Sequence, residues 1–254
     1  MNLKTSSPSR PAVGVVGPGR LGVSLTRALK AAGWSVDGPA GRGEVPSGEV
    51  ILLCVPDAEI PAAAEVVTGA APFVGHTSGA TSLGALAPAG VEALGLHPLQ
   101  TFTGAEGPEA FFGVGCAVEG STPRALELAE ELARGLGMEP FELDEEGRDA
   151  YHAAASMASN FLVTLEAAAE QVASGAGLSP PRARALLGPL VARTVDNWAA
   201  LGPERALTGP VARGDDATVQ RQRAAVEETA PELLELFDAL MARTRALAGN
   251  GVAA

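Results

Sequence analysis

The fold is decided by the stretch Val13-Gly14-Val15-Val16-Gly17-Pro18-Gly19-Arg20-Leu21-Gly22. Its first four residues are small or β-prone and predict a strand, and an apolar pattern with helical spacing begins at Leu21. The three glycines between these segments spell G-x-G-x-x-G. Gly17 permits a tight turn, Gly19 lets the backbone approach a pyrophosphate, and Gly22 lets the helix pack closely against the strand. The stretch therefore predicts a dinucleotide-binding loop, with a purely structural strand-to-helix turn as the alternative.

The predicted loop supplies the first set of expected cofactor contacts. Free N–H groups and the positive dipole end of the helix favour phosphate there. The end of the next predicted strand, residues 34–37, is where a residue that reads the ribose is expected. Asp37 would favour NAD, and Arg42 in the following loop would favour NADP; Asp37 lies slightly early, so NADP is favoured and NAD stays open. The expected phosphate-binding residues are Gly17, Pro18, Gly19, Arg20, Leu21 and Gly22.

Composition narrows the class of protein. The chain has 254 residues, is 46% hydrophobic and carries a net charge of −12, which argues against nucleic acid or an anionic membrane surface as a partner. No apolar run approaches the ~20 residues of a membrane span. Residues 1–11 resemble no signal peptide and predict a disordered tail. Cys54 and Cys116 lie in apolar runs without metal-ligand spacing, so we expect buried thiols, no metal site and a cytoplasmic protein.

Strands and helices alternate through the first part of the chain, which predicts an α/β fold with a doubly wound parallel sheet. The apolar run at residues 50–55 is typical of a parallel strand buried on both faces. A helix is expected at residues 122–137, with a Ser/Thr start and a Gly stop. The remaining strands are expected at residues 12–16, 34–37, 73–76, 92–96, 112–118 and 138–143.

The strand signals stop after residue 146. Residues 148–173 predict one long Ala-rich helix, and further helices are expected at 180–201, 215–227 and 231–247, with a loop at 202–214. We therefore expect a dinucleotide-binding domain at residues 12–146 and an all-helical domain at 147–250. The apolar helices of the second domain are consistent with a homodimer formed through it.

Candidate catalytic residues follow two of the predicted strands. Ligands in open α/β sheets bind outside the carboxyl ends of the strands. Ser78 and His97 both lie there, and His97 is the best single candidate for a general acid because an ordinary imidazole titrates near neutral pH. His76 has a weaker claim, since it can simply satisfy backbone groups. A structural role is the alternative for each.

A polar stripe lies on the long predicted helix. His152, Ser156 and Asn160 are four residues apart and share one helix face, so they can line an active-site cleft or make helix–helix hydrogen bonds. Arg213, in the predicted loop, can hold a substrate carboxylate, whereas Asp215 is better explained as a helix cap. The only lysines are Lys4 and Lys30, neither placed to act on a substrate.

These segments together resemble a bacterial family with an N-terminal Rossmann-like domain and a C-terminal helical domain of long-unassigned function. The family belongs to the superfamily of pyrroline-5-carboxylate reductase, prephenate dehydrogenase and ketopantoate reductase. The resemblance implies cofactor contacts at Val55 and Pro56, and it places Ser78 and His97 like catalytic residues of prephenate dehydrogenases and Asn160 like the asparagine of ketopantoate reductases. Those reductases carry a lysine one turn before the asparagine, where this chain has Ser156. The matching stretches are residues 17–22, 55–57, 76–80, 96–102, 151–160 and 208–215.

The residues and the resemblance together imply an NADP-dependent reductase of a small 2-oxo or imino carboxylic acid, with 2-dehydropantoate as one candidate. In this hypothesis His97 or His152 donates the proton, Ser78 and Asn160 polarise the substrate, and Ser156 and Arg213 bind it. Two alternatives stay open. One is a non-catalytic NADP(H)-binding regulator, and the other is a prephenate-type or deazaflavin-dependent dehydrogenase.

Overall fold

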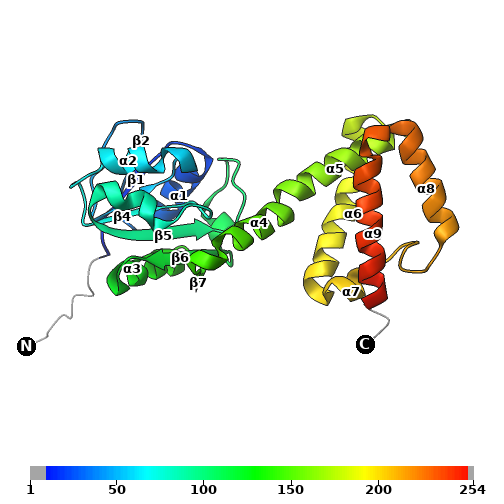
Figure 1. Ribbon diagram of the computed structural model, residues 1–254. Coiled ribbons are helices and arrows are strands. Elements are labelled where there is room, and N and C mark those ends of the chain that lie inside the picture. Colours follow the sequence, from blue (N-terminus) through cyan, green and yellow to red (C-terminus); the bar gives the residue numbers. More distant parts are fainter. Residues whose placement is uncertain (1–9, 251–254) are drawn as a thin grey trace, which may run out of the picture. The chain divides into compact units, whose positions relative to one another are not determined.

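The computed structural model describes residues 10–250, which form two compact units divided between Ser159 and Asn160. The first unit holds the sheet and the second is helical, as expected from the sequence (Figure 1). The sequence put the domain boundary near residue 146. The contacts instead group the helix that starts at Arg148 with the sheet.

The first unit is built on a seven-stranded sheet in the order β2-β1-β3-β4-β5-β6-β7. Neighbouring strands from β2 to β5 run parallel, as the alternation of strands and helices predicts. This confirms the Rossmann-like α/β class. The strands are β1 (Val13–Val16), β2 (Val36–Ala40), β3 (Val50–Leu53), β4 (Phe73–His76), β5 (Glu92–Pro98), β6 (Gly115–Gly120) and β7 (Glu139–Glu142).

One strand pair departs from the parallel direction of the rest of the sheet. β6 pairs antiparallel with β5 and parallel with β7. The segment between β5 and β6 forms only the short 3-10 helix η3 (Pro108–Phe111) and no α-helix. Parallel neighbours usually need a helical crossover, so without one the chain returns in the opposite direction.

The second strand extends further than the sequence predicts. β2 reaches Ala40 and includes Gly38 and Pro39, which the turn-forming composition of residues 38–48 assigned to a loop. Pro39 is compatible with pairing because β2 is an edge strand, where the missing N–H of proline costs no ladder bond.

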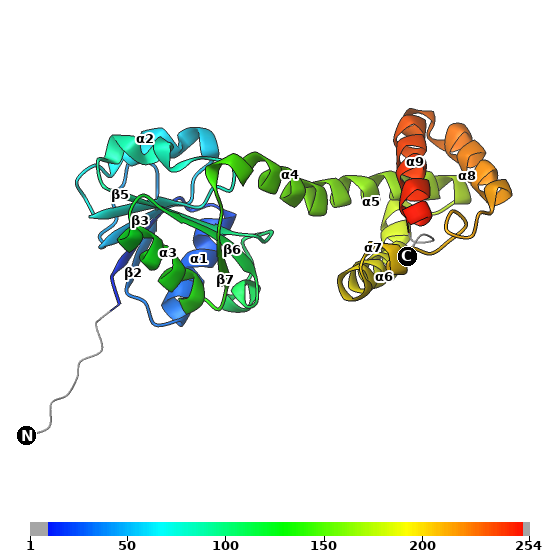
Figure 2. The ribbon, with the colours of Figure 1, turned by 60° about the horizontal axis from the view of Figure 1, so that its bottom comes forward.

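Helices cover both faces of the sheet (Figure 2), and an apolar core lies between the sheet and each layer of helices. Val13, Val15 and Leu52 face α1 (Arg20–Ala31) and α3 (Pro123–Gly135) on one side. Ile51, Leu53 and Val74 face α2 (Ile60–Val66) and the 3-10 helix η2 (Leu83–Ala89) on the other. This alternation is the period of two that a strand buried on both faces requires. The helical caps match the sequence: Gly33 ends α1 with a positive φ, and the Thr122 side chain accepts from Ala125 N–H at the start of α3.

The expected long helix is divided at Ser159 into α4 (Arg148–Ala158), in the first unit, and α5 (Asn160–Ala173), in the second. The second unit continues with α6 (Pro180–Leu201), α7 (Pro203–Ala206), α8 (Asp216–Thr229) and α9 (Leu234–Asn250). Its side chains are largely exposed, and α5 buries none of its residues. The polar stripe therefore lies on helices that are mostly exposed in the single chain.

Further sequence expectations concern the predicted tail and the two cysteines. Residues 1–9 of the predicted tail lie outside the described residues, whereas Arg10 donates to Ala32 O at 2.6 Å and lies over the Trp34 ring. Cys54 and Cys116 are free thiols, and burial raises the pKa of each to about 12. Within residues 10–250, no helix is long and apolar enough to cross a membrane, and His, Cys, Asp and Glu form no cluster of three suited to a metal ion.

Candidate functional site

The carboxyl ends of the parallel strands form one edge of the sheet. β2 lies on one side of β1, and the next strand in the chain, β3, lies on the other side. The strand order therefore reverses between β1 and β3. Crevices at such reversals are where open α/β sheets bind ligands. The loops that border this crevice are the glycine turn after β1 and residues 54–56 after β3, which include the expected contacts Val55 and Pro56.

Each glycine of the turn has its own structural reason. Gly17 has φ +104°, and a Cβ there would lie 2.3 Å from Cys54 O. A Cβ on Gly22 would lie 1.9 Å from Gly17 O, so only glycine lets α1 start this close to β1. A Cβ on Gly19 would meet nothing within 4 Å. Gly17 and Gly22 are therefore required by the protein's own packing, whereas Gly19 borders open space.

The start of α1 leaves its backbone donors available. Gly19 is the N-cap residue, no side chain caps the helix, and its first turn has no acidic residue. Uncapped N–H groups and the helix dipole make such an end favourable for an anion. Pro18, Gly19 and Arg20 are exposed, as a phosphate-binding turn requires. The turn thus offers the exposed, uncapped backbone N–H groups that suit a pyrophosphate.

The two candidate ribose-reading residues differ in their surroundings. The Asp37 carboxylate accepts from both Ser47 N–H and Ser47 Oγ at 2.8 Å, and these bonds lower its pKa. Arg42 follows the end of β2 by two residues, is exposed, and pairs with Glu59 at 2.7 Å. Glu59 lies in η1 (Asp57–Glu59), directly after the β3 loop. Arg42 is therefore an exposed cation whose recorded partner is the exposed Glu59, while Asp37 holds its own loop together.

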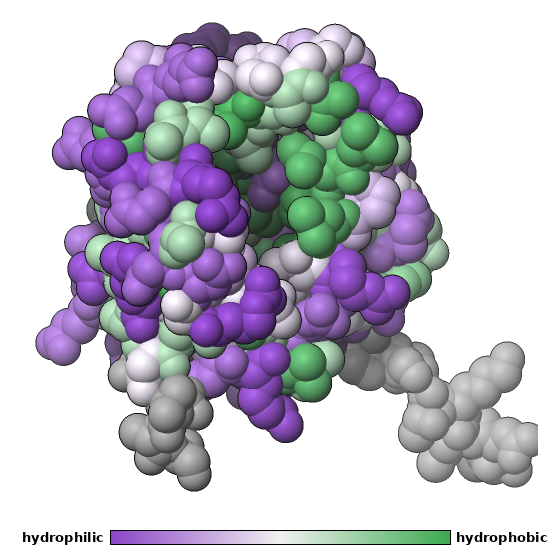
Figure 3. Space-filling view, turned by 90° about the vertical axis from the view of Figure 1, so that its right-hand side faces the viewer, coloured by the Kyte–Doolittle hydropathy of each residue, from purple (hydrophilic) through white to green (hydrophobic). Residues whose placement is uncertain are grey.

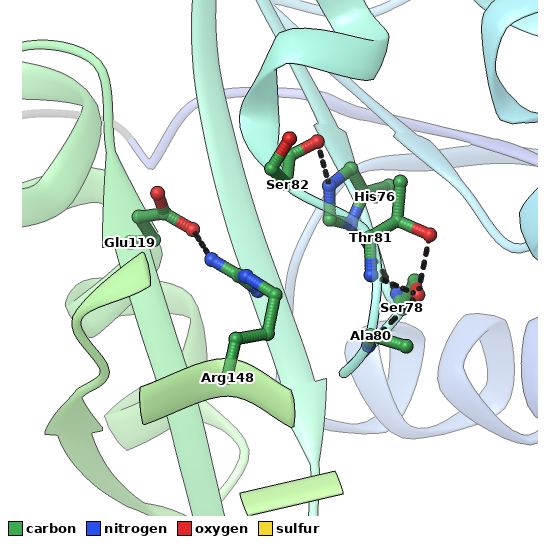
Figure 4. Close-up of polar contacts among 7 residues, drawn as sticks. All are labelled: His76, Ser78, Ala80, Thr81, Ser82, Glu119 and Arg148. Atoms are coloured by element: carbon green, nitrogen blue, oxygen red, sulfur yellow. Dashed lines mark hydrogen bonds and ion pairs between the residues drawn. The ribbon is translucent and has the colours of Figure 1, made fainter. Parts of the chain in front are cut away.

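Ser78 and His76 shape the turn after β4 (Figure 4). The Ser78 Oγ accepts from Ala80 and Thr81 N–H at 3.2 and 3.0 Å and donates to Thr81 Oγ1. His76 Nδ1 accepts from Ser78 N–H, which leaves Nε2 to donate to Ser82 O. Both side chains are thus engaged inside the turn. Ser78 therefore has no free donor with which to polarise a substrate. His76 satisfies backbone groups, which is the alternative that the sequence analysis gave for it.

His97 lies at the end of β5, beside this turn. Its Nδ1 is 2.7 Å from the hydroxyl of Tyr151, which comes from α4. The imidazole ring packs against Gly79: a Cβ at that position would lie 2.6–2.9 Å from three of its atoms. The Tyr151 ring in turn packs edge-on against Phe141 of β7. The imidazole is therefore held between the β4 turn and a tyrosine that is itself packed.

The electrostatic surroundings keep His97 uncharged. Burial is the main cause that lowers the His97 pKa to about 4, with His152, His76 and Arg148 acting in the same direction and Asp57 against them. Burial also raises the pKa of Tyr151 to about 12. The pair is thus neutral at pH 7, which differs from the acid that an ordinary histidine pKa led us to expect.

A buried arginine lies near the same strand end. Arg148, the first residue of α4, is only 7% exposed and pairs with Glu119 of β6 (Figure 4). Its Nε has no hydrogen-bond partner among the described residues. Arg148 and Glu119 line, with His97, Ser78 and Gly79, a small pocket of about 10 Å³, which is room for one water molecule. The ion pair anchors α4 to the sheet.

The other expected site residues are distributed over both units. His152, exposed, and Ser156, half-buried, lie on α4, whereas Asn160 begins α5 and Arg213 lies in an exposed turn of the helical unit. Asp215 accepts from Thr218 N–H and caps α8, as predicted. The structure therefore brings together Ser78 and His97 at neighbouring strand ends, and it leaves the roles of Asn160 and Arg213 as predictions.

Two residues of the site were missed by the sequence analysis. Arg148 and Tyr151 lie next to the polar stripe, but neither has a spacing that singles it out. The available signals were that Tyr151 is the only tyrosine of the chain and that Arg148 opens a helix directly after an acidic turn. Neither signal indicates a partner, because Glu119 and His97 are 29 and 54 residues away in the sequence.

A family match covers the last two strands of the sheet, β6 and β7, and most of the helical unit. Residues 114–244, just over half of the chain, match the family described as "Domain of unknown function (DUF2520)". A search of curated proteins found none similar to this chain.

Solved structures share the fold over nearly the whole chain. A protein from Bacteroides fragilis, named as a candidate NADP oxidoreductase, has a TM-score of 0.78 at 19% identity, covering 94% of this chain and 100% of its own. A protein from Thermotoga maritima has a TM-score of 0.74 at 24% identity, covering 94% and 99%. A pyrroline carboxylate reductase from Plasmodium falciparum, solved with NADP bound, has a TM-score of 0.60 at 11% identity, covering 94% and 99%.

Proposed function

Because this chain belongs to the DUF2520 family, whose description assigns no activity, we propose from its own site that it is an NADP-dependent oxidoreductase. The substrate class we propose is a small carboxylic acid with a C=O or C=N bond next to the carboxylate. The observation that carries the proposal is the glycine turn, where two glycines are required by packing and the third, Gly19, borders open space. Packing gives no steric reason for that third glycine, and a purely structural helix start would ordinarily carry a capping side chain, which α1 lacks.

Each part of the strand-end edge has a role in this proposal. The N–H groups at the start of α1 bind the pyrophosphate, and Val55 and Pro56 border the same crevice. Arg42 binds the 2′-phosphate, since its planar fork of donors suits phosphate and Asp37 is engaged elsewhere. The nicotinamide supplies hydride when it is bound, and the protein supplies position and polarity.

The substrate end is proposed at β5 and α4. His97 provides a polar group at the reacting atom, and His152 and Ser156, from the same helix as Tyr151, complete that side. We retain Asn160 and Arg213 of the helical unit as the proposed amide and guanidinium contacts to the substrate. Proteins of similar fold include ones named as pyrroline-5-carboxylate reductases and an imine reductase, which supports including C=N substrates in the test.

We further propose that the helical unit forms a homodimer. The unit contains a cavity of about 370 Å³ with an almost wholly apolar lining, including Leu165, Val172 and Phe237. Figure 3 shows hydrophobic residues around a hollow in the surface of this unit. Large apolar side chains such as Leu190 and Trp198 are also exposed, at 63% and 58%. Exposed apolar area of this kind is typical of a protein–protein interface. Sedimentation analysis tests this directly, and a monomer at micromolar concentration would contradict it.

The first experiment is an equilibrium titration of the full chain with NADPH and with NADH, followed by NADPH oxidation on a panel of 2-oxo and cyclic imino acids led by 2-dehydropantoate. We expect NADPH to bind more tightly than NADH. Arg42→Gln should weaken NADPH binding about tenfold, by ~1.4 kcal/mol, and leave NADH binding unchanged. NADH lacks the 2′-phosphate, so it serves as the control ligand for the same variant.

Three outcomes separate the alternatives. NADPH oxidation that depends on one substrate supports the reductase. Tight NADPH binding without turnover on any member of the panel favours the non-catalytic NADP(H)-binding regulator or a different substrate class. Absence of binding to either nucleotide would contradict the role assigned to residues 17–22 and with it the whole proposal.

A further inference from the structure

The contact between His97 and Tyr151 joins two parts of the first unit that are 54 residues apart in the sequence. Tyr151 is held in place from two sides. Its ring meets Phe141 at 5.8 Å between centroids, and the Arg148–Glu119 pair fixes the helix one turn earlier. The Tyr151 hydroxyl is the only polar partner recorded for the His97 ring within residues 10–250. The state of the imidazole therefore depends on which of the two groups donates.

The chemistry of the two groups decides the direction of this bond. A phenol O–H is more acidic than the N–H of a neutral imidazole, and an imidazole nitrogen is a better acceptor than a phenol oxygen. The hydroxyl therefore donates and Nδ1 accepts. When one ring nitrogen accepts a hydrogen bond, the proton of a neutral histidine resides on the other.

We propose that Tyr151 is a positioning residue that holds His97 as the neutral tautomer with its proton on Nε2. His97 then offers an N–H donor to the substrate's reacting oxygen or nitrogen instead of acting as an imidazolium acid. This inference rests on the proposed function for its catalytic meaning, but the tautomer itself is a property of the chain alone. The inference assigns Tyr151, the only tyrosine of the protein, to positioning His97, whereas the glycine turn and Arg42 are proposed to bind the nucleotide.

The charged and titratable groups around His97 agree with this state. Arg148, from α4, and His76, from β4, both disfavour a positive charge on the ring, as does His152 on α4. Asp57, after β3, favours a positive charge, but burial of the ring outweighs it. Gly79 packs directly against the ring, and a Cβ at that position would lie 2.6–2.9 Å from three ring atoms.

The test is a long-range ¹H–¹⁵N spectrum of the full chain labelled at histidine, recorded from pH 8 to pH 5. The chain has three histidines, so His97 can be assigned with a His97→Gln variant. We expect one protonated nitrogen, Nε2, one bare nitrogen, Nδ1, and no protonation step within this range. Tyr151→Phe should lower the Nε2–H to Nδ1–H ratio roughly 2- to 10-fold, as loss of one hydrogen bond of ordinary strength implies.

Phe141→Leu is the matched control, because it removes a ring contact of Tyr151 but keeps the hydroxyl. It should leave the His97 tautomer unchanged. A proton on Nδ1, a His97 that is charged at pH 7, or an unchanged tautomer in Tyr151→Phe would each overturn the inference. None of these readouts requires bound nucleotide, so failure of the proposed function, seen in the NADPH titration, is distinguished from failure of this inference.

Discussion

Gly19 and Gly22 both lie at the start of α1. Replacing each of them by alanine distinguishes an effect on packing from an effect on ligand binding. In Gly22→Ala the new methyl carbon would lie 1.9 Å from Gly17 O and 3.2 Å from Cys54 Cβ. The carbonyl must retreat by roughly 1.5 Å to reach an ordinary contact. Overpacking costs about 1–3 kcal/mol and occasionally more. Since the nearest atom belongs to the backbone, we expect about 3 kcal/mol and a fall in Tm of roughly 6–12 °C.

Gly19→Ala should behave in the opposite way. Its φ and ψ, −72° and −178°, are open to alanine, and its methyl group would meet nothing within 4 Å. Reduced freedom of the unfolded chain stabilises by ~0.4–1 kcal/mol, and the poorer N-cap preference of alanine offsets this gain. We expect unfolding to be unchanged within ~1 kcal/mol. Because the methyl group occupies the approach to the helix N-terminus, NADPH affinity should fall about tenfold or more.

The assay for both variants is urea unfolding followed by fluorescence, combined with the NADPH titration. An unchanged free energy of unfolding in Gly22→Ala would refute the packing reasoning. Undiminished NADPH affinity in Gly19→Ala would refute the assignment of the open space beside Gly19 to the pyrophosphate. The two results are independent, so either part of the reasoning can fail alone.

Three further predictions concern the first unit. Gly79→Ala should displace the His97 ring and destabilise the chain by about 1–3 kcal/mol in urea unfolding. Gly84→Ala is the control and should not destabilise it, because its new methyl group meets only Ser82 Oγ, at 3.4 Å. Equal stability of the two variants would contradict the ring packing. Arg148→Met leaves the Glu119 carboxylate without its partner and should lower the free energy of unfolding by about 2–4 kcal/mol. The double variant with Glu119→Gln should recover part of this loss. A double variant less stable than Arg148→Met would count against loss of the ion pair as the cause. Hydrogen bonds from Thr103 lower the Glu106 pKa to about 2. The contribution of Glu106 to stability is therefore present above its unfolded pKa, near 4.5, and is lost as pH falls from about 4.5 to 2. Glu106→Gln should flatten this part of the pH–stability curve, and an unaltered curve would show that another group causes it.

Much of the fold could be predicted from the sequence because it depends on residues that are close in the chain. The glycine turn, the caps at Thr122 and Asp215 and the continuous apolar run of β3 are local signals with local causes. Predictions weakened where a neighbour in space decides the outcome. Pro39 lies in a strand because β2 is at the edge of the sheet, and β6 reverses because no helix crosses over before it.

The candidate site divides in the same way. The sequence determined by itself that residues 17–22 form a strand-to-helix turn with three glycines and that His97 lies at a strand end, since both follow from spacing along the chain. Only the tertiary structure decided that Ser78 is engaged within its own turn, that Arg148 is buried against Glu119, and that Tyr151 bonds to His97. The physical reason is that a side chain's charge state and hydrogen-bonding partners depend on burial and on groups brought close by folding, and no local pattern encodes either.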